Sequence, residues 1–204
     1  MNHAVLERFV KLVTLALVLS MLGVMLYRTF DTGNPGDYPA EKGDIHLSSG
    51  EWEAAIADFD TALEKDSGHY GAMMGRAVAL SQLGRTDAAR EQFDDLIAYL
   101  EQLDDPNREY QIQGTLAAAY ANRGILMDRT GHHRQALDDY IAAMRTDPDV
   151  VEGPGVVGKI LHDPTPSTIR KRAEYLAKEL EKPEEKRLLR VPEKDAEERQ
   201  LWKP

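Results

Sequence analysis

A repeat of 34 residues constrains the fold of this 204-residue chain more than any other feature. The segment that begins at residue 43 aligns with the segment that begins at residue 77, and a third copy begins at residue 124. All three copies share a glycine, then an alanine, then an aromatic residue. These positions are Gly50, Ala55 and Phe59 in copy one, Gly84, Ala89 and Phe93 in copy two, and Gly131, Ala136 and Tyr140 in copy three. Such a period is typical of stacked units that cannot bury their apolar faces alone.

The spacing of these residues resembles that of the tetratricopeptide repeat (TPR) family. Members of this family place a small residue at the eighth position, which Gly43, Ala77 and Gly124 fill, and a glycine at the turn between two helices. The resemblance covers about residues 38–150. It implies an all-α fold, a right-handed superhelical stack of about three TPR helix pairs plus a C-terminal capping helix.

The third copy departs from the period, because it follows the second by 47 residues rather than 34. Apolar residues keep helical spacing through Leu100 and Leu103, and a turn follows at residues 104–107. We therefore predict a longer helical pair at this point, whose next helix starts near Arg108.

Residues 151–190 are predicted to form a connection and the capping helices. After a Gly/Pro-interrupted segment, Ile169, Ala173, Leu176 and Leu180 recur at helical spacing, and the opposite face carries Arg, Lys and Glu. One apolar stripe and one charged face suit the terminal helix of a stack. The charged tail, residues 191–204, ends near Leu201 and Trp202.

A run of apolar residues at 12–27, extended to residue 9, predicts a transmembrane helix in front of the repeats. A helix over residues 9–27 would be about 28 Å long at about 1.5 Å per residue, which matches a hydrocarbon core of about 30 Å. A cleaved signal peptide is the alternative, although no small-x-small site follows closely. We expect an anchor at 1–30, a linker at 31–39 and a TPR domain at 40–150.

The positive flank of this run sets the expected topology. Arg8 and Lys11 lie on the N-terminal side and Arg28 lies on the other. The positive-inside rule therefore favours a single-pass membrane protein with a cytoplasmic N-terminus and the TPR domain on the outer, periplasmic side.

Charge and composition argue against several functions. Residues 38–166 carry a net charge of about −12, which disfavours nucleic acid but equally suits a device for solubility. There is no cysteine. His132 and His133 are expected in a solvated turn, the Asp/Glu pairs on solvated surfaces, and GPGVVG at 153–158 lacks the lysine of a phosphate loop. We predict no enzyme, no metal, no cofactor and no small-molecule substrate.

The resemblance places ligand contacts in a concave groove lined by the first helix of each repeat. Chaperone-binding members carry a basic clamp there, but the fifth positions of this chain are Ala40, Met74 and Ala121. The alternative is that the groove residues pack against the chain's own C-terminal helix. The candidate partner-binding residues are Leu47, Met74, Val78, Gln82, Ala121, Ile125 and Arg129, together with Trp202 of the tail.

These features predict a membrane-anchored protein–protein interaction module, with a protein partner that is itself membrane-bound. Its expected role is that of an accessory, assembly or scaffold subunit of a membrane protein complex. The alternative is a receptor or chaperone for targeted or unfolded client polypeptides.

Overall fold

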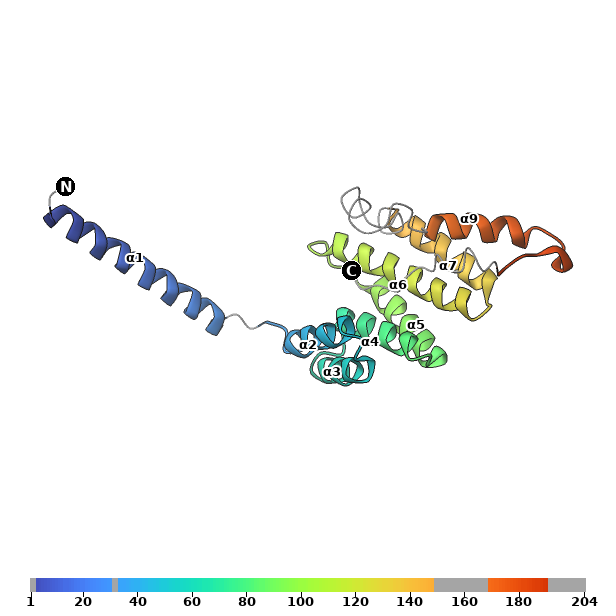
Figure 1. Cartoon of the computed structure of the whole chain (residues 1–204), viewed down its shortest axis with the longest axis horizontal. Coiled ribbons are helices and arrows are strands. Elements are labelled where there is room, and N and C mark those ends of the chain that lie inside the picture. Colours follow the sequence, from blue (N-terminus) through green and yellow to red (C-terminus); the bar gives the residue numbers. More distant parts are fainter. Residues whose placement is uncertain (1–2, 31–32, 149–168, 191–204) are drawn as a thin grey trace. The chain divides into compact units, whose positions relative to one another are not determined.

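A computed structural model of the chain describes residues 3–30, 33–148 and 169–190, and Figure 1 colours them along the sequence. The chain divides into two units, Met1–Pro35 and Gly36–Pro204. The predicted GPGVVG segment and the tail with Trp202 lie outside the described residues.

The first unit consists of one helix, α1 (His3–Phe30), of 28 residues. Its described apolar side chains are exposed, as at Leu12 with 66% and Met21 with 75% of the surface accessible. Near its start, Lys11 forms an ion pair with Glu7 one turn earlier at 2.7 Å. Within the described part of the chain, no helix has both the length and the apolar character that crossing a membrane requires.

The second unit is a succession of antiparallel helices, each packed on its neighbours in sequence. Every regular element described in the chain is helical, so the prediction of an all-α fold is confirmed. The elements are α2 (Asp37–Ser48), α3 (Trp52–Lys65), α4 (Tyr70–Gln82), α5 (Thr86–Gln102), α6 (Glu109–Arg129), α7 (His133–Thr146), α9 (Ile169–Leu180) and the 3-10 turn η2 (Glu184–Lys186).

The three repeated glycines end the first helix of each pair in the same way. Gly50, Gly84 and Gly131 have φ values of +77°, +71° and +86°, the left-handed region that glycine enters without a Cβ clash. After Gly50, the amide of Glu51 donates to the carbonyl of His46 at 2.9 Å, and equivalent bonds follow the other two glycines. This closure satisfies the last helical carbonyls and reverses the chain.

The repeated aromatic residue wedges neighbouring helices together. Phe59 of α3 is fully buried, and its ring fills the space beside two glycines on different helices. A Cβ at Gly43 of α2 would lie 2.6 Å from the ring, and one at Gly75 of α4 would lie 2.3 Å from it. Only glycine therefore permits this close approach at both positions. Phe93 and Tyr140, at the equivalent places, are also fully buried.

The longer pair predicted at the second and third copies is also present. Helices α5 and α6 have 17 and 21 residues, compared with 12 to 14 in the other repeat helices. The segment between them contains Asp105, whose side chain accepts a bond from the amide of Asn107 at 3.0 Å. Helix α6 then begins at Glu109, one residue after the predicted start.

Candidate functional site

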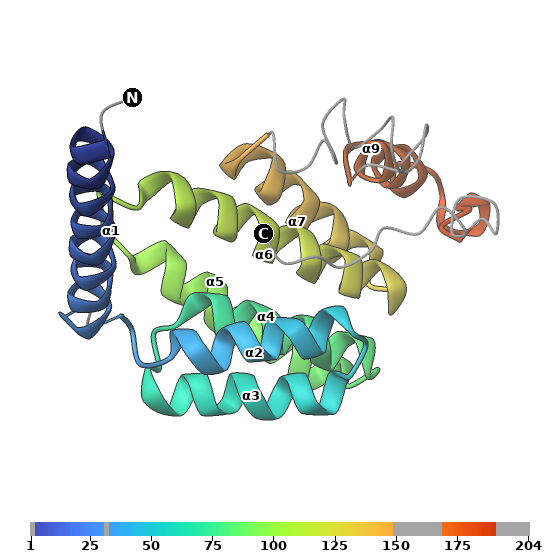
Figure 2. The same cartoon turned by 60° about the vertical axis from the view of Figure 1, so that its left-hand side comes forward.

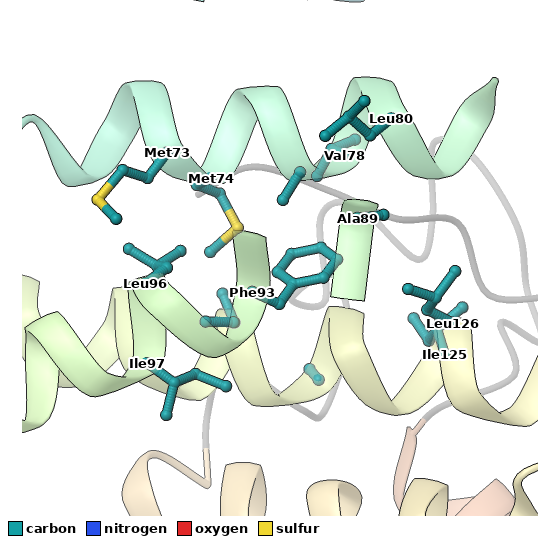
Figure 3. Close-up of a cluster of buried hydrophobic side chains, with 14 of the residues drawn as sticks. Met73, Met74, Val78, Leu80, Ala89, Phe93, Leu96, Ile97, Ile125 and Leu126 are labelled. Carbon is teal, nitrogen blue, oxygen red and sulfur yellow. The ribbon is translucent and has the colours of Figure 1, made fainter. Parts of the chain in front are cut away.

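Most of the predicted groove residues lie in the core rather than on an open surface. Met74, Val78, Ala121 and Ile125 expose 0%, 3%, 0% and 2% of their surface. Figure 3 shows Met74 pointing from α4 towards Phe93 of α5. Asn122 of α6 also reaches this layer, because its amide nitrogen lies 3.5 Å from the sulfur of Met74.

The other predicted groove residues are more accessible. Leu47 is half-buried against the core, Gln82 is exposed and Arg129 is half-buried. The residues that a ligand could reach directly along the first helices are therefore few. The assignment of these side chains to a partner stays a prediction.

Helix α9 lies against α7 and closes the stack (Figure 2). Ile169, Ala173 and Leu176 of its predicted stripe are buried, with 6%, 2% and 0% exposed, and Leu180 is partly buried. The same helical face carries Arg172, of which only 4% is exposed. A buried cation on this stripe calls for a carboxylate partner.

That partner is Asp128 of α6, which precedes the predicted groove residue Arg129. The Nε and Nη2 atoms of Arg172 each donate to one oxygen of the Asp128 carboxylate at 2.7 Å. His133 Nδ1 lies 3.1 Å from the same carboxylate, and the Tyr140 hydroxyl donates to it at 3.3 Å. A planar guanidinium paired in this bidentate way is among the strongest charged contacts in proteins.

The segment after α9 adds to this contact. Arg172 Nη2 donates to the carbonyl of Leu189 at 3.0 Å, and Arg190 Nη2 donates to the carbonyls of Asp128 and Arg129. The chain's own C-terminal residues thus lie beside Arg129, one of the predicted groove residues of the third repeat. This arrangement favours the alternative in which the groove is filled internally.

The sequence pattern did not predict this pair, and the prediction of a solvated turn was wrong for one histidine. His132 is exposed as expected, but the neighbouring His133 is buried beside Asp128 rather than solvated. The available signal was the position of Arg172, three residues after Ile169 and four before Leu176, on the apolar face of its helix.

A pocket of about 550 Å³ opens between α5, α6 and α7. Its lining includes four aspartates, two arginines and Met127, contributed by the three helices. Copy one carries Trp52 and Ile56 where copy two carries Thr86 and Arg90, which line the pocket. Thr86 is smaller and more polar than Trp52, and Arg90 is charged where Ile56 is apolar.

One arginine organises the inner wall of this pocket. Arg123 donates to Asp94 of α5 at 2.7 Å and to both carboxylate oxygens of Asp139 of α7, at 2.7 and 3.0 Å. Burial lowers the pKa of Arg123, but the two carboxylates outweigh this effect and hold it above its ordinary value. The guanidinium therefore stays charged and fixes both aspartates.

The pocket nevertheless keeps a surplus of negative charge. Burial raises the pKa of Asp139, and the charges of Asp94 and Asp138 raise it further, although Arg123 opposes them. Asp87 and Asp138 are exposed at the rim and form no ion pair within the described residues. A cationic side chain that entered the pocket would meet two uncompensated carboxylates.

Comparison with known proteins agrees with this architecture. Residues 41–104 match the model of the tetratricopeptide repeat family. This region of the chain therefore carries tetratricopeptide repeats. The first TPR of Spaghetti (RPAP3), solved bound to the HSP90 peptide SRMEEVD, has a similar fold, with a TM-score of 0.52 and 16% identity over 75% of this chain and 99% of that chain.

A curated relative resembles part of the repeat region. The chain is 31% identical over 88 residues to the tetratricopeptide repeat and J domain-containing co-chaperone DNJ1 of Fusarium oxysporum f. sp. lycopersici. The matched region is 39% of this chain and 17% of that protein, so the likeness concerns the repeats and not the whole relative. TPR proteins mediate protein–protein interaction, which agrees with the interaction module predicted from the sequence.

The TPR stack described here does not carry the basic clamp of chaperone-binding members at its fifth positions. Ala40, Met74 and Ala121 occupy them, and all three are buried. In the described residues, no group of three or more His, Asp or Glu side chains is placed to hold a metal ion. The exposed charged side chains of the stack are mainly those of aspartates and glutamates.

Proposed function

We propose that this TPR protein is a non-enzymatic receptor for polypeptide segments of client proteins, of the co-chaperone kind, and that it prefers segments with basic side chains. The observation that carries this proposal is the pocket between α5, α6 and α7, where Asp87 and Asp138 lack ion-pair partners in the described chain. An Arg or Lys side chain of a client fits this pocket by charge and brings the counter-charge that its rim lacks.

The remaining surface supports the same ligand class. The region 38–166 has a net charge of about −12, so it attracts basic segments over a distance of about 10 Å at moderate salt. The groove offers no cation at the fifth positions, and its third-repeat end is covered by Arg172 and Arg190. At the fifth positions, a peptide with an acidic C-terminus therefore finds no countercharge.

The comparisons favour a client receptor over a fixed subunit. The curated relative is named a co-chaperone, and the solved TPR neighbour holds a peptide. Because the chain spans 17% of the length of that relative, the activity of the whole relative is not transferred. What is carried over is the capture of polypeptide segments by a TPR stack.

We also propose that this receptor is anchored at a membrane. Its support is the apolar run at residues 12–27, together with the exposed apolar side chains of α1. The charge bias around the run supports a cytoplasmic N-terminus and repeats on the outer side. A second candidate, an accessory or assembly subunit of a membrane complex, is favoured by the same helix, since tethering raises the effective concentration towards a membrane partner.

The test uses two unstructured, fluorescently labelled peptides. They are identical except that the basic peptide carries Arg and Lys where the neutral peptide carries Gln. The variant pair Asp87→Asn with Asp138→Asn removes the two free carboxylates. The control pair Glu64→Gln with Asp95→Asn changes the net charge equally on exposed positions outside the pocket. Two exposed ion pairs of about 0.5–1 kcal/mol each predict a Kd about fivefold to thirtyfold weaker for the basic peptide.

The control should weaken binding by less than about twofold, and the loss in the pocket variant should shrink at high salt. Equal affinity for the basic and neutral peptides would exclude the proposed preference. If the two pairs of substitutions weakened binding equally, the pocket would not be the site. A single stoichiometric partner on copurification would favour the second candidate.

A further inference from the structure

The repeats of this protein are joined to each other by the same charged contact at two interfaces. Arg76 of α4 donates through Nε to Asp60 of the preceding helix α3, at 2.6 Å. Arg123 of α6 donates through Nη1 to Asp94 of the preceding helix α5, at 2.7 Å. The arginines occupy equivalent positions of their repeats, and so do the aspartates.

Each of these arginines also holds the second helix of its own repeat. Arg76 Nη1 donates to the side-chain oxygen of Gln92 at 2.8 Å, and Arg123 donates to Asp139. A cation at this position therefore bridges two partners, one in its own repeat and one in the repeat before it.

The first repeat has only half of this bridge. Lys42 of α2 occupies the equivalent position, and its Nζ lies 2.7 Å from Asp58 of α3, its own second helix. Lys42 belongs to the first helix of the stack, so no earlier repeat helix supplies a second carboxylate. Its side chain is 51% exposed, compared with 30% for Arg76 and 21% for Arg123.

The apolar part of the interface is also left open on α2. Tyr38 and Ile45, one turn before and one turn after Lys42, are 75% and 60% exposed. The equivalent residues of the inner repeats pack against the preceding helix pair and expose at most 4%. These residues are Ala72 and Ala79 in copy two and Ala119 and Leu126 in copy three.

We propose that Tyr38, Lys42 and Ile45 form a docking face for an α-helix of a partner protein, which presents one carboxylate among small apolar side chains. This N-terminal face continues the interface that joins α3 to α4 and α5 to α6. The carboxylate of the partner takes the place that Asp60 and Asp94 have at the inner interfaces. Because Tyr38 and Ile45 are larger than the alanines at the inner interfaces, the opposing side chains of the partner must be small.

The internal geometry argues for another protein rather than a second copy of this chain. Asp60 and Asp94 already bind Arg76 and Arg123, so the helices that carry them are occupied. The third repeat has Ile141 at that position. Helix α9 exposes alternating charges, such as Lys171, Glu174 and Lys178, and no apolar stripe that could cover the N-terminal face.

Lys42 is suited to receive such a carboxylate. Its hydrogen bond with Asp58 raises the pKa of the Lys42 ammonium above the ordinary value of 10.5, although burial opposes this change. The ammonium has three donors, and one of them is used by Asp58. A second carboxylate would complete the bridge seen at Arg76 and Arg123.

The test places a photocrosslinking benzoyl-phenylalanine at Tyr38 in the full chain, expressed in cells that contain the natural partner. Tyr110, which is 83% exposed, carries the same group as the matched control. The expected crosslink at Tyr38 maps to a helix of another protein in which an Asp or Glu is flanked by Ala, Gly or Ser. Lys42→Glu should lower its yield at least fivefold, and Lys42→Arg should preserve it.

Crosslinks from Tyr38 that are no stronger than those from Tyr110, or that map to a second copy, to residues 1–35 or to a segment without a carboxylate, would overturn the proposal. If Lys42→Glu unfolds the first repeat, Ile45→Ser replaces it, with Leu188→Ser, at an equally exposed position, as its control. A yield unchanged by Ile45→Ser would also overturn it. These variants should leave binding of the basic peptide unchanged, which separates this face from the pocket.

Discussion

Replacing Arg172 by methionine should detach the C-terminal helix from the third repeat. The Arg172 and Asp128 side chains are 3% and 5% exposed, and two hydrogen bonds of 2.7 Å join them. Methionine keeps much of the apolar stem but removes the guanidinium that both oxygens of the buried Asp128 carboxylate bind. Removal of one partner from a buried pair costs about 3–5 kcal/mol, a large part of the 5–15 kcal/mol that is typical of whole domains.

The loss can be measured as a thermal shift and located by hydrogen exchange. For a unit of this size, about 2–4 °C is lost per kcal/mol, so the midpoint should fall by about 6–20 °C. Amides of α9 should lose protection before those of α2 to α5. The control is Lys178→Met, on the exposed face of the same helix, which should change the unfolding free energy by less than about 0.5 kcal/mol.

A second variant separates the charge from the packing. In Arg172→Met with Asp128→Asn both charges are gone, so the double variant should be more stable than Arg172→Met alone. A loss below about 1 kcal/mol in Arg172→Met, or no recovery in the double variant, would refute the view that this pair holds the C-terminal helix in place.

Three further predictions concern other parts of the chain. Phe59→Ala should destabilise the stack by about 3–5 kcal/mol in urea unfolding, because the ring fills the space beside Gly43 and Gly75; an unchanged midpoint would contradict its role as a wedge. Deleting residues 1–30 should leave a folded helical protein, and loss of its helical circular dichroism would contradict the predicted domain division. Burial raises the pKa of Asp58, but hydrogen bonds from Lys42 and His46 outweigh burial and hold it below its ordinary value of 3.8. Its stabilisation is therefore present above pH 3.8 and lost as the pH falls below that value. Asp58→Asn should lower the unfolding free energy at pH 7 and flatten its fall below about pH 4, and an equally steep fall in the variant would contradict this assignment.

The repeat architecture follows from the sequence because its signals are local and recur at fixed spacing. A glycine such as Gly84 is needed wherever the chain reverses with a positive φ, and an aromatic residue such as Phe93 is needed wherever two helices leave a gap. The stripe of Ile169, Ala173 and Leu176 likewise follows from helical periodicity alone. All of these features could be predicted without knowing which helices meet.

Which side chains are buried and which are exposed depends on contacts between residues far apart in the chain. Only the tertiary structure decided these contacts. The pair of Asp128 and Arg172 spans 44 residues, and no local pattern in the sequence joins them. Residues predicted to line a groove, such as Met74 and Ile125, are buried because neighbouring helices approach closely at small residues. The open positions, Tyr38 and Ile45, are exposed because their helix is the first of the stack. Burial at a given repeat position depends on which neighbour exists, and the repeat pattern itself is the same in an inner copy and in a terminal one.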